Sequence, residues 1–475
     1  MNSHNQLSAR FNTQEIVEKD KAHFTHPWQI FDTFPEAGAL PIAKGEGCHI
    51  WDTDGNRYFD AVGGLWCNNI GLGRKEMADA IARQAYELAY ASGFVDITNP
   101  AAAELAAKLA SIAPGDLNHV IFTCGGSTAN DSAYRLMHFY NNKRGKRDKK
   151  HVISRINSYH GSTYIAMSIG GKPGDKSPAF DYEDKLIHHV GCPDYYKAPE
   201  GMSEPEFVDT LVREFEDKII ELGGAEKVMA YFAEPVMGAG GVIVPPEGYN
   251  KRMWESCRKY DILYVSDEVV TAFGRLGHWF ASEAEFDIQP DIITCAKGLT
   301  SGYLPLGAAI YSDKIAEVVH ETGHGDCFTN GYTYSGHPVA CAAALKNIRI
   351  MEDERIFDNV KETGPYFRAQ LETLLDLPVV GQVRGRQLMQ CIEFVKNKET
   401  KELFPEDLDI GKRIANNADP KGLIVRPLVN LNIMSPPLIM TKEDVDFVVK
   451  VLREAILETV EELRDEGHFG EHHHA

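Results

Sequence analysis

The feature that most constrains the fold is a series of short apolar runs, each followed by a small or polar residue and then a stretch with helical periodicity. The runs lack the alternation of a half-exposed strand, as expected for strands that helices cover on both faces. We therefore predict an α/β fold whose large domain has a central, mostly parallel sheet flanked by helices. The six runs occupy residues 119–123, 151–154, 228–233, 262–265, 291–295 and 306–311.

The two ends of the chain show another pattern and are predicted to form one smaller α/β domain. Residues 48–60 alternate like paired strands around Asp54-Gly55-Asn56, which is a strong hairpin signal. A mixed helical and strand-like pattern follows residue 340. The expected division is residues 1–70 as the N-terminal part of the small domain, 71–337 as the large domain and 338–475 as the C-terminal part of the small domain.

Charge and cysteine usage narrow the classes of partner. The chain has 49 Lys+Arg and 69 Asp+Glu, and a formal charge of -20 repels nucleic acid and anionic membranes. The basic run at residues 143–151 is expected to be a solvated surface loop. Nine scattered cysteines without a C-x-x-C pair, and an N-terminus without an apolar segment, favour a cytoplasmic enzyme. The terminal EHHHA at residues 471–475 is left out of these predictions.

Residues that carry chemistry follow the apolar runs directly. Ligands of doubly wound sheets bind at the carboxyl ends of the strands, so these residues are expected to meet at one edge. No cysteine and histidine pair among them has the spacing of a zinc site, so no metal is expected. The residues are Gly126, Ser127, Tyr159, His160, Gly161, Glu234, Asp267 and Lys297.

Lys297 and Asp267 form the central pair of this predicted site. They lie about one strand-to-strand crossover apart, so adjacent strands could bring their side chains together. A lysine there could bind pyridoxal 5'-phosphate (PLP) as a Schiff base, while an aspartate beside the pyridine nitrogen keeps that nitrogen protonated. A buried structural ion pair accounts for these two residues equally well, and an isolated lysine at a strand end is usually an exposed charge.

Further residues suit the remainder of such a cofactor. Gly126 and Ser127 open a predicted helix, whose free N–H groups and dipole favour a phosphate, although plain helix caps look similar. Tyr159 has a flat ring to lie over one face of the pyridine, and Val269 is placed to press on the other face. Each of these residues taken alone is more often part of an ordinary core.

Eight ordered segments resemble the class III (omega) aminotransferases of PLP fold type I. The resemblance runs from Trp51 to Pro437, through GGLWCNNIGLG, CGGSTAND, YHGST, AEPVMGAGG, SDEVVTAFGRLG, AKGLTSGYLPLGA, YTYSGHPVACAAAL and GLIVRPL. It implies catalytic roles for Lys297 and Asp267 and a cofactor site in the large domain. The family often has an acid where this chain has Thr128. The cofactor contacts implied are Gly126, Ser127, Tyr159, His160, Gly161, Glu234, Asp267, Val269, Lys297 and Thr333.

The resemblance also implies a subgroup, a substrate pocket and a homodimer. Family members that use glutamate read E-P-[IV]-Q-G-E-G, whereas this chain has Met237 and Ala239 at the Gln and second Glu. It is similar instead to amine:pyruvate or omega-amino acid:pyruvate transaminases. In that subgroup Arg426 would bind the carboxylate of pyruvate or alanine. Trp66, Phe94 and Tyr159 would form a large apolar pocket, and Thr333 would reach the phosphate in the partner subunit of a dimer, which could pair into a tetramer.

The expected reaction is therefore a ping-pong transamination from a primary amine or omega-amino acid to pyruvate, through a Schiff base on Lys297. A decarboxylase, racemase or aminomutase on the same fold stays open, since the same groups do not choose the bond that breaks. A nicotinamide-dependent dehydrogenase is disfavoured because the glycine pattern at residues 71–76 ends in Glu76 and follows no suitable strand. A non-catalytic PLP-binding protein is a third alternative.

Overall fold

The largest element in the computed structural model, which describes residues 7–94, 96–321 and 325–470, is a sheet of seven strands. All six apolar runs form strands, and a seventh strand, β6, has the sequence IHHV, whose two histidines hide its apolar character. The terminal segment 471–475 lies outside the described residues. In spatial order the strands are β4 (Leu117–Thr123), β10 (Gly307–Ser312), β9 (Ile292–Cys295), β8 (Leu263–Asp267), β7 (Val228–Ala233), β5 (His151–Arg155) and β6 (Ile187–Val190).

The predicted mostly parallel sheet is confirmed, with one antiparallel strand. Strands β6, β5, β7, β8 and β9 pair in parallel, whereas β10 is antiparallel to both β9 and β4. Residues 296–306 connect β9 to β10, and this connection is shorter than the crossover of a dozen or more residues that a parallel pairing needs. The chain therefore turns back beside β9 and leaves the cofactor-type residues at the carboxyl ends of β8 and β9.

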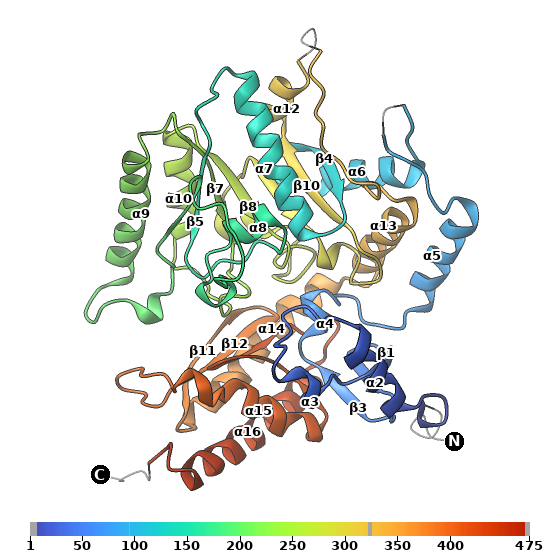
Figure 1. Cartoon of the computed structure of the whole chain (residues 1–475), viewed down its shortest axis with the longest axis vertical. Helices are drawn as coiled ribbons and strands as arrows, with labels where there is room; N and C mark the ends of the chain where they lie inside the picture. Colours follow the sequence, from blue (N-terminus) through green and yellow to red (C-terminus); the bar gives the residue numbers. More distant parts are fainter. Residues whose placement is uncertain (1–6, 95, 322–324, 471–475) are drawn as a thin grey trace.

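Helices cover both faces of this sheet, which explains why its strands are apolar throughout. One face packs on α7 (Gly126–Lys143), and the other packs on α9 (Glu204–Glu221) and α10 (Tyr249–Lys259). Successive residues of β7 alternate between the two layers, with Tyr231 toward α9 and α10 and Phe232 toward α7. Figure 1 shows this layered part of the chain as the upper body.

The other helices of this part pack at its margins. Helix α13 lies against α5 and α6 in this upper part, so the large part extends past residue 337, where the sequence placed its end. None of the helices in the described ranges is long and apolar enough to cross a membrane. Their bounds are α5 (Lys75–Glu87), α6 (Pro100–Ile112), α8 (Tyr164–Ile169), α11 (Ala281–Phe286), α12 (Asp313–Val319) and α13 (Pro338–Asp353), with the short 3-10 turns η1 (Pro173–Asp175), η2 (Tyr195–Lys197) and η3 (Lys297–Leu299).

Two four-stranded sheets from both ends of the chain form the smaller part, in the lower half of Figure 1. The predicted hairpin pairs β2 (His49–Asp52) with β3 (Arg57–Asp60), and β3 pairs in parallel with β13 (Leu423–Ile424), which joins the two ends. The remaining strands are β1 (Ile42–Glu46), β11 (Val380–Arg386), β12 (Met389–Phe394), β14 (Arg426–Leu428) and β15 (Leu431–Met434). The helical segments are α2 (Thr13–His23), α3 (Phe34–Ala37), α4 (Gly63–Trp66), α14 (Ile356–Glu372), η4 (Thr373–Asp376), η5 (Glu406–Leu408), α15 (Ile410–Ala418), η6 (Asp419–Lys421) and α16 (Lys442–Asp465).

The basic run at residues 143–151 is not entirely the solvated loop that its charge predicts. The side chain of Lys149 is fully buried, and its Nζ donates to the carbonyl oxygen of Ala225 at 2.8 Å. Burial lowers the pKa of Lys149 to about 8, although Asp261 acts in the opposite direction. The prediction is wrong for this residue because the charge pattern carries no information about which lysine the neighbouring segment covers.

The double-sided burial of the central strands predicts a stability effect. Replacing Phe232 with alanine should lower the free energy of unfolding by about 3–5 kcal/mol, because a fully buried ring leaves a cavity in β7. The urea midpoint followed by circular dichroism measures this change. Phe180→Ala, at a ring that is 67% exposed, is the control and should change the free energy by no more than about 0.5 kcal/mol. Equal effects of the two substitutions would contradict the packing described above.

Candidate active site

A cavity of about 1030 Å³ lies at the carboxyl ends of β8 and β9 and is lined by residues of both the large sheet and the smaller part of the chain. It brings together eleven of the residues singled out in the sequence. Phe94 and Thr333 do not line it. The eleven are Trp66, Gly126, Ser127, Tyr159, His160, Gly161, Glu234, Asp267, Val269, Lys297 and Arg426.

Lys297 is held at the bottom of the cavity by the turn that follows β9. It begins η3 with a positive φ of 41°, and the side chain of Asn347 on α13 donates to the carbonyl oxygens of Gly298 and Leu299 at 2.8 and 3.0 Å. Its Nζ lies 5.2 Å from the centre of the Trp66 ring. Burial lowers the pKa of the Lys297 amine, and Asp267 is the strongest of the groups that act in the opposite direction. Burial thus disfavours the charged form of this amine, as a nucleophilic role would require.

Asp267 ends β8, and three donors fix the orientation of its buried carboxylate. Nδ1 of His160 lies 2.7 Å from Oδ2, and Nδ2 of Asn130 donates to the same oxygen at 2.8 Å. The backbone N–H of Val269 donates to Oδ1 at 3.1 Å. Strands β8 and β9 are neighbours and run parallel, so their carboxyl ends meet at one edge of the sheet. Asp267, at the end of β8, and the turn that carries Lys297, after β9, therefore lie at the same edge, as the sequence predicted.

Asn130 is a site residue that the sequence did not single out. It lies one turn into α7, is fully buried, and donates to the carbonyl oxygen of His160 as well as to Asp267. Its own Oδ1 accepts a hydrogen bond from Thr294 of β9. In the sequence, Asn130 is an amide residue in the segment CGGSTAND, four residues after the helix start. The neighbouring residues do not indicate that its side chain faces Asp267, which lies 137 positions away.

The turn before α7 forms a narrow cup against the segment after β5. A Cβ on Gly161, whose φ is +137°, would lie 2.5 Å from Oγ and 2.7 Å from Cα of Ser127. A Cβ on Gly126 would lie 2.9 Å from the Val269 side chain. Oγ of Ser127 accepts a hydrogen bond from the backbone N–H of Ser162 at 3.0 Å. The cup thus combines glycines that permit close approach with the N-terminus of an 18-residue helix, an arrangement suited to an anion.

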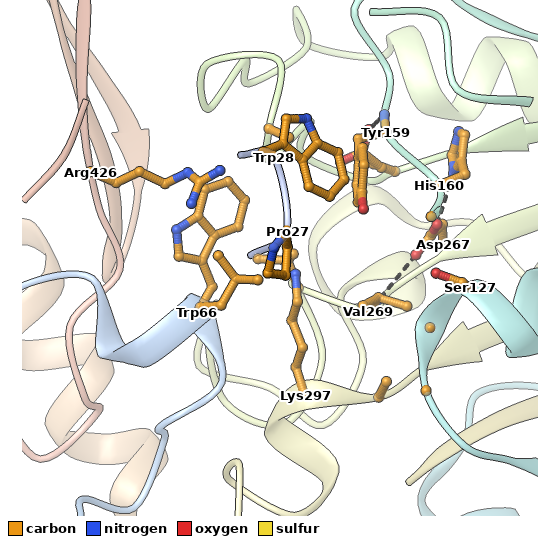
Figure 2. A pocket seen from close by; sticks show the side chains of 18 of the residues that line it. Pro27, Trp28, Trp66, Ser127, Tyr159, His160, Asp267, Val269, Lys297 and Arg426 are labelled. Carbon is orange, nitrogen blue, oxygen red and sulfur yellow. Dashed lines mark hydrogen bonds and ion pairs between the residues drawn. The ribbon is translucent and has the colours of Figure 1, made fainter. Parts of the chain in front are cut away.

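Glu234 supports the aromatic wall of the cavity. Its buried carboxylate accepts hydrogen bonds from the backbone N–H groups of Tyr159 at 3.1 Å and of Gly238 at 2.7 Å. Burial raises the pKa of Glu234 above its usual value. The structure therefore shows Glu234 positioning Tyr159, whose ring borders the cavity on the side opposite Trp66 (Figure 2).

Trp66 lies near both Arg426 and Lys297. Its indole is buried, with the Arg426 guanidinium carbon 6.0 Å and the Lys297 amine nitrogen 5.2 Å from the ring centre (Figure 2). Burial lowers the pKa of Arg426, and Asp175 and Tyr159 oppose that effect. Arg426, in β14, thus places a cation at the end of the cavity away from Lys297.

The N-terminal segment contributes three lining residues that the sequence did not indicate, namely Pro27, Trp28 and Ile30. Pro27 and Trp28 border the cavity, and the Trp28 ring lies 6.0 Å from that of Tyr159. Trp28 has a positive φ of 55° and remains 58% exposed. This wall depends on the folding of a segment far from the other lining residues, so no local pattern predicts it.

Phe94 and Thr333 lie together on an exposed surface instead. The hydroxyl of Tyr90 donates to the carbonyl oxygen of Thr333 at 2.9 Å, and a Cβ on Gly331 would lie 3.5 Å from the Phe94 ring. Thr333 is in a turn, not in a strand, and its side chain is exposed. Neither residue meets the cavity of its own chain.

Comparison with known proteins places these residues in a family. The family model described as aminotransferase class-III matches residues 35–456. A putrescine--pyruvate aminotransferase of Pseudomonas aeruginosa is 41% identical over 448 residues, which cover 94% of this chain and 97% of that protein. A mitochondrial gamma-aminobutyrate transaminase 1 of Oryza sativa subsp. indica is 38% identical over 94% of this chain and 85% of that protein.

A solved structure has the same fold. The omega transaminase of Pseudomonas jessenii in complex with PMP superposes with a TM-score of 0.92, at 36% identity, over 96% of this chain and 100% of that one. Fold type I, which the family resemblance implied, is thereby confirmed.

The close approach of Gly161 to Ser127 predicts a defect in cofactor binding. Gly161→Ala places a Cβ against the Ser127 backbone at a φ that alanine rarely adopts, so the affinity for PLP should fall by about tenfold or more. Titration of the protein stripped of cofactor, followed by visible absorption, measures this affinity. Gly174→Ala is the matched control, since a Cβ there meets nothing within 4 Å. Unchanged affinity in the Gly161 variant would show that the cup does not hold the phosphate.

Proposed function

The chain belongs to the class III aminotransferases, which use PLP, and we propose that it moves an amino group from a primary amine or omega-amino acid to pyruvate, giving alanine. The observation that carries the proposal is one cavity that joins a nucleophilic lysine to a cationic arginine across an apolar wall. Putrescine--pyruvate aminotransferase is similar along nearly its whole length, which supports pyruvate as acceptor. Gamma-aminobutyrate transaminases match almost as well, so the acceptor needs a direct test.

The residues of the cavity fit PLP. The cup of Gly126, Ser127 and Gly161 leaves space that a Cβ would fill, and it opens on a helix N-terminus. Asp267 presents an oriented carboxylate deeper in the site, and Tyr159 and Val269 offer flat and branched walls. When bound, the cofactor supplies an electron sink for the bond broken at the amine carbon.

Lys297 is proposed to carry the covalent attachment and the proton transfer. Burial lowers its pKa, which favours the neutral amine that both roles require. Asp267 is proposed to stand against the ring nitrogen, held there by His160 and Asn130. Trp66 and Tyr159 exclude water from this end of the cavity while leaving room for an apolar substrate group.

Arg426 is proposed to select the acceptor. A guanidinium binds a carboxylate with two parallel hydrogen bonds, so pyruvate can enter with its carboxylate toward Arg426 and its carbonyl toward Lys297. Ala239 lines the cavity where glutamate-dependent relatives carry an acid. No acid at position 239 therefore pairs with Arg426. This supports a short keto acid as the amino acceptor in preference to 2-oxoglutarate.

The exposed cluster around Thr333 supports a homodimer. Phe94, Tyr90 and Tyr334 are all exposed beside it, and a second subunit covering them would exclude apolar surface from water. We propose that Thr333 then meets the partner's phosphate cup. All nine cysteines are free thiols, which supports the proposed cytoplasmic location.

The first test removes the amine of Lys297. Lys297→Ala should abolish alanine formation from pyruvate and any amine, because both the attachment and the proton transfer lose their nitrogen. The visible spectrum of the loaded protein shows whether cofactor still binds, and chromatography of products measures turnover. Lys396→Ala, at an exposed lysine, is the control. Wild-type turnover in the Lys297 variant would refute the assignment, and release of carbon dioxide by the wild type would favour a decarboxylase instead.

The second test concerns the acceptor. In the wild type, pyruvate should restore the cofactor absorption that an amine has bleached, and 2-oxoglutarate should do so poorly. Arg426→Lys keeps a charge but loses the two-bond grip, so KM for pyruvate should rise about tenfold. Arg386→Lys, outside the cavity, is the matched control. Equal use of the two keto acids would overturn pyruvate as the preferred acceptor.

A further inference from the structure

An acid lies in the cavity where the proposed reaction has no use for one. Asp175 ends the 3-10 turn η1, in the segment between α8 and β6, and lines the cavity together with Tyr159 and Arg426. Its side chain is 14% exposed. No sequence motif drew attention to it, and it is separate from Glu234 and Asp267, the acids that follow the strands.

The carboxylate of Asp175 is only partly satisfied. Nζ of Lys172 lies 3.1 Å from Oδ1 and forms an ion pair with it. Within residues 7–94, 96–321 and 325–470, no hydrogen bond reaches Oδ2. Lys176, the next residue, donates instead to the carbonyl oxygens of Met167 and Ser168. One oxygen of Asp175 is therefore free to accept a hydrogen bond from a ligand cation.

The acids that line the cavity raise the pKa values of different basic groups. Asp267 and Glu234 are the carboxylates that raise the pKa of Lys297 against burial. Asp175 is the carboxylate that does the same for Arg426. Asp175 lines the same cavity as Arg426 and is not among the charges that act on Lys297, so it belongs to the end of the cavity near Arg426.

We propose that Asp175 binds the second ammonium group of a diamine whose first amino group reacts at Lys297. This rests on the proposed amine-dependent transamination. The methylene chain of the diamine would lie along Trp66 and Tyr159, which wall the cavity between its two charged ends. Arg426 and Asp175 would then bind different substrates at this end of the cavity. The Arg426 guanidinium binds the carboxylate of the keto acid, and the Asp175 carboxylate binds the free ammonium group of the diamine. One cavity can thus take a dication and an anion in turn.

The test compares two donors of nearly equal length. Diaminobutane and pentylamine differ at one end, where the second carries a methyl group in place of an ammonium. The rate and concentration dependence of cofactor bleaching by each amine, without any acceptor, yield their specificity ratio. In the Asp175→Asn variant this ratio of diaminobutane to pentylamine should fall about tenfold, mainly through weaker binding of diaminobutane. Asp175→Glu, which keeps the charge, should recover part of the preference.

Asp181→Asn is the matched control, because Asp181 is an exposed acid six positions on that does not line the cavity. The proposal is overturned if the ratio is unchanged in Asp175→Asn, or if it falls as far in Asp181→Asn. Failure of the acceptor assignment looks different: diaminobutane would bleach the cofactor in an Asp175-dependent way, yet pyruvate would not restore the absorption. An absence of bleaching by any amine in the wild type would overturn both.

Discussion

The parallel pairing of β8 with β9 is the constraint on which the site depends. It ends two strands at one edge, so that a buried carboxylate, Asp267, and a lysine, Lys297, enter one cavity. Burying both groups is costly unless each is held in a polar environment. His160 and Asn130 hold the acid, and Asn347 holds the turn that carries the lysine. These contacts come from α7, α13 and the segment after β5, so three separate parts of the fold hold Asp267 and the Lys297 turn in place.

Close backbone approach is the second requirement of the site. Gly161 and Gly126 each sit where a methyl group would collide, one with Ser127 and the other with Val269. The first contact closes the phosphate-type cup, and the second joins the cup to Val269, a wall of the ring site. The position of the cup relative to Asp267 is therefore set by backbone packing and not by flexible side chains, which is what a rigid cofactor requires.

Charge at the end of the cavity near Arg426 is proposed to govern substrate choice. Ala239 places no acid there, and Asp175, which lines the same cavity from a different segment, supplies one. Substrate choice in such a cavity follows from the placement of a few charges on an apolar wall, while the catalytic pair stays the same.

The sequence alone was sufficient for six of the seven strands of the large sheet and for the smaller domain's hairpin. Of its thirteen candidate site residues, eleven line the cavity, because strand periodicity and strand-end position are local properties. It could not reveal Asn130 as the partner of Asp267, Trp28 as a wall, Asp175 beside Arg426 or the burial of Lys149. Each of those depends on which distant segment packs against which, and a local pattern does not encode that choice. The exposed positions of Phe94 and Thr333 likewise follow from tertiary packing, since their own segments look no different from buried ones.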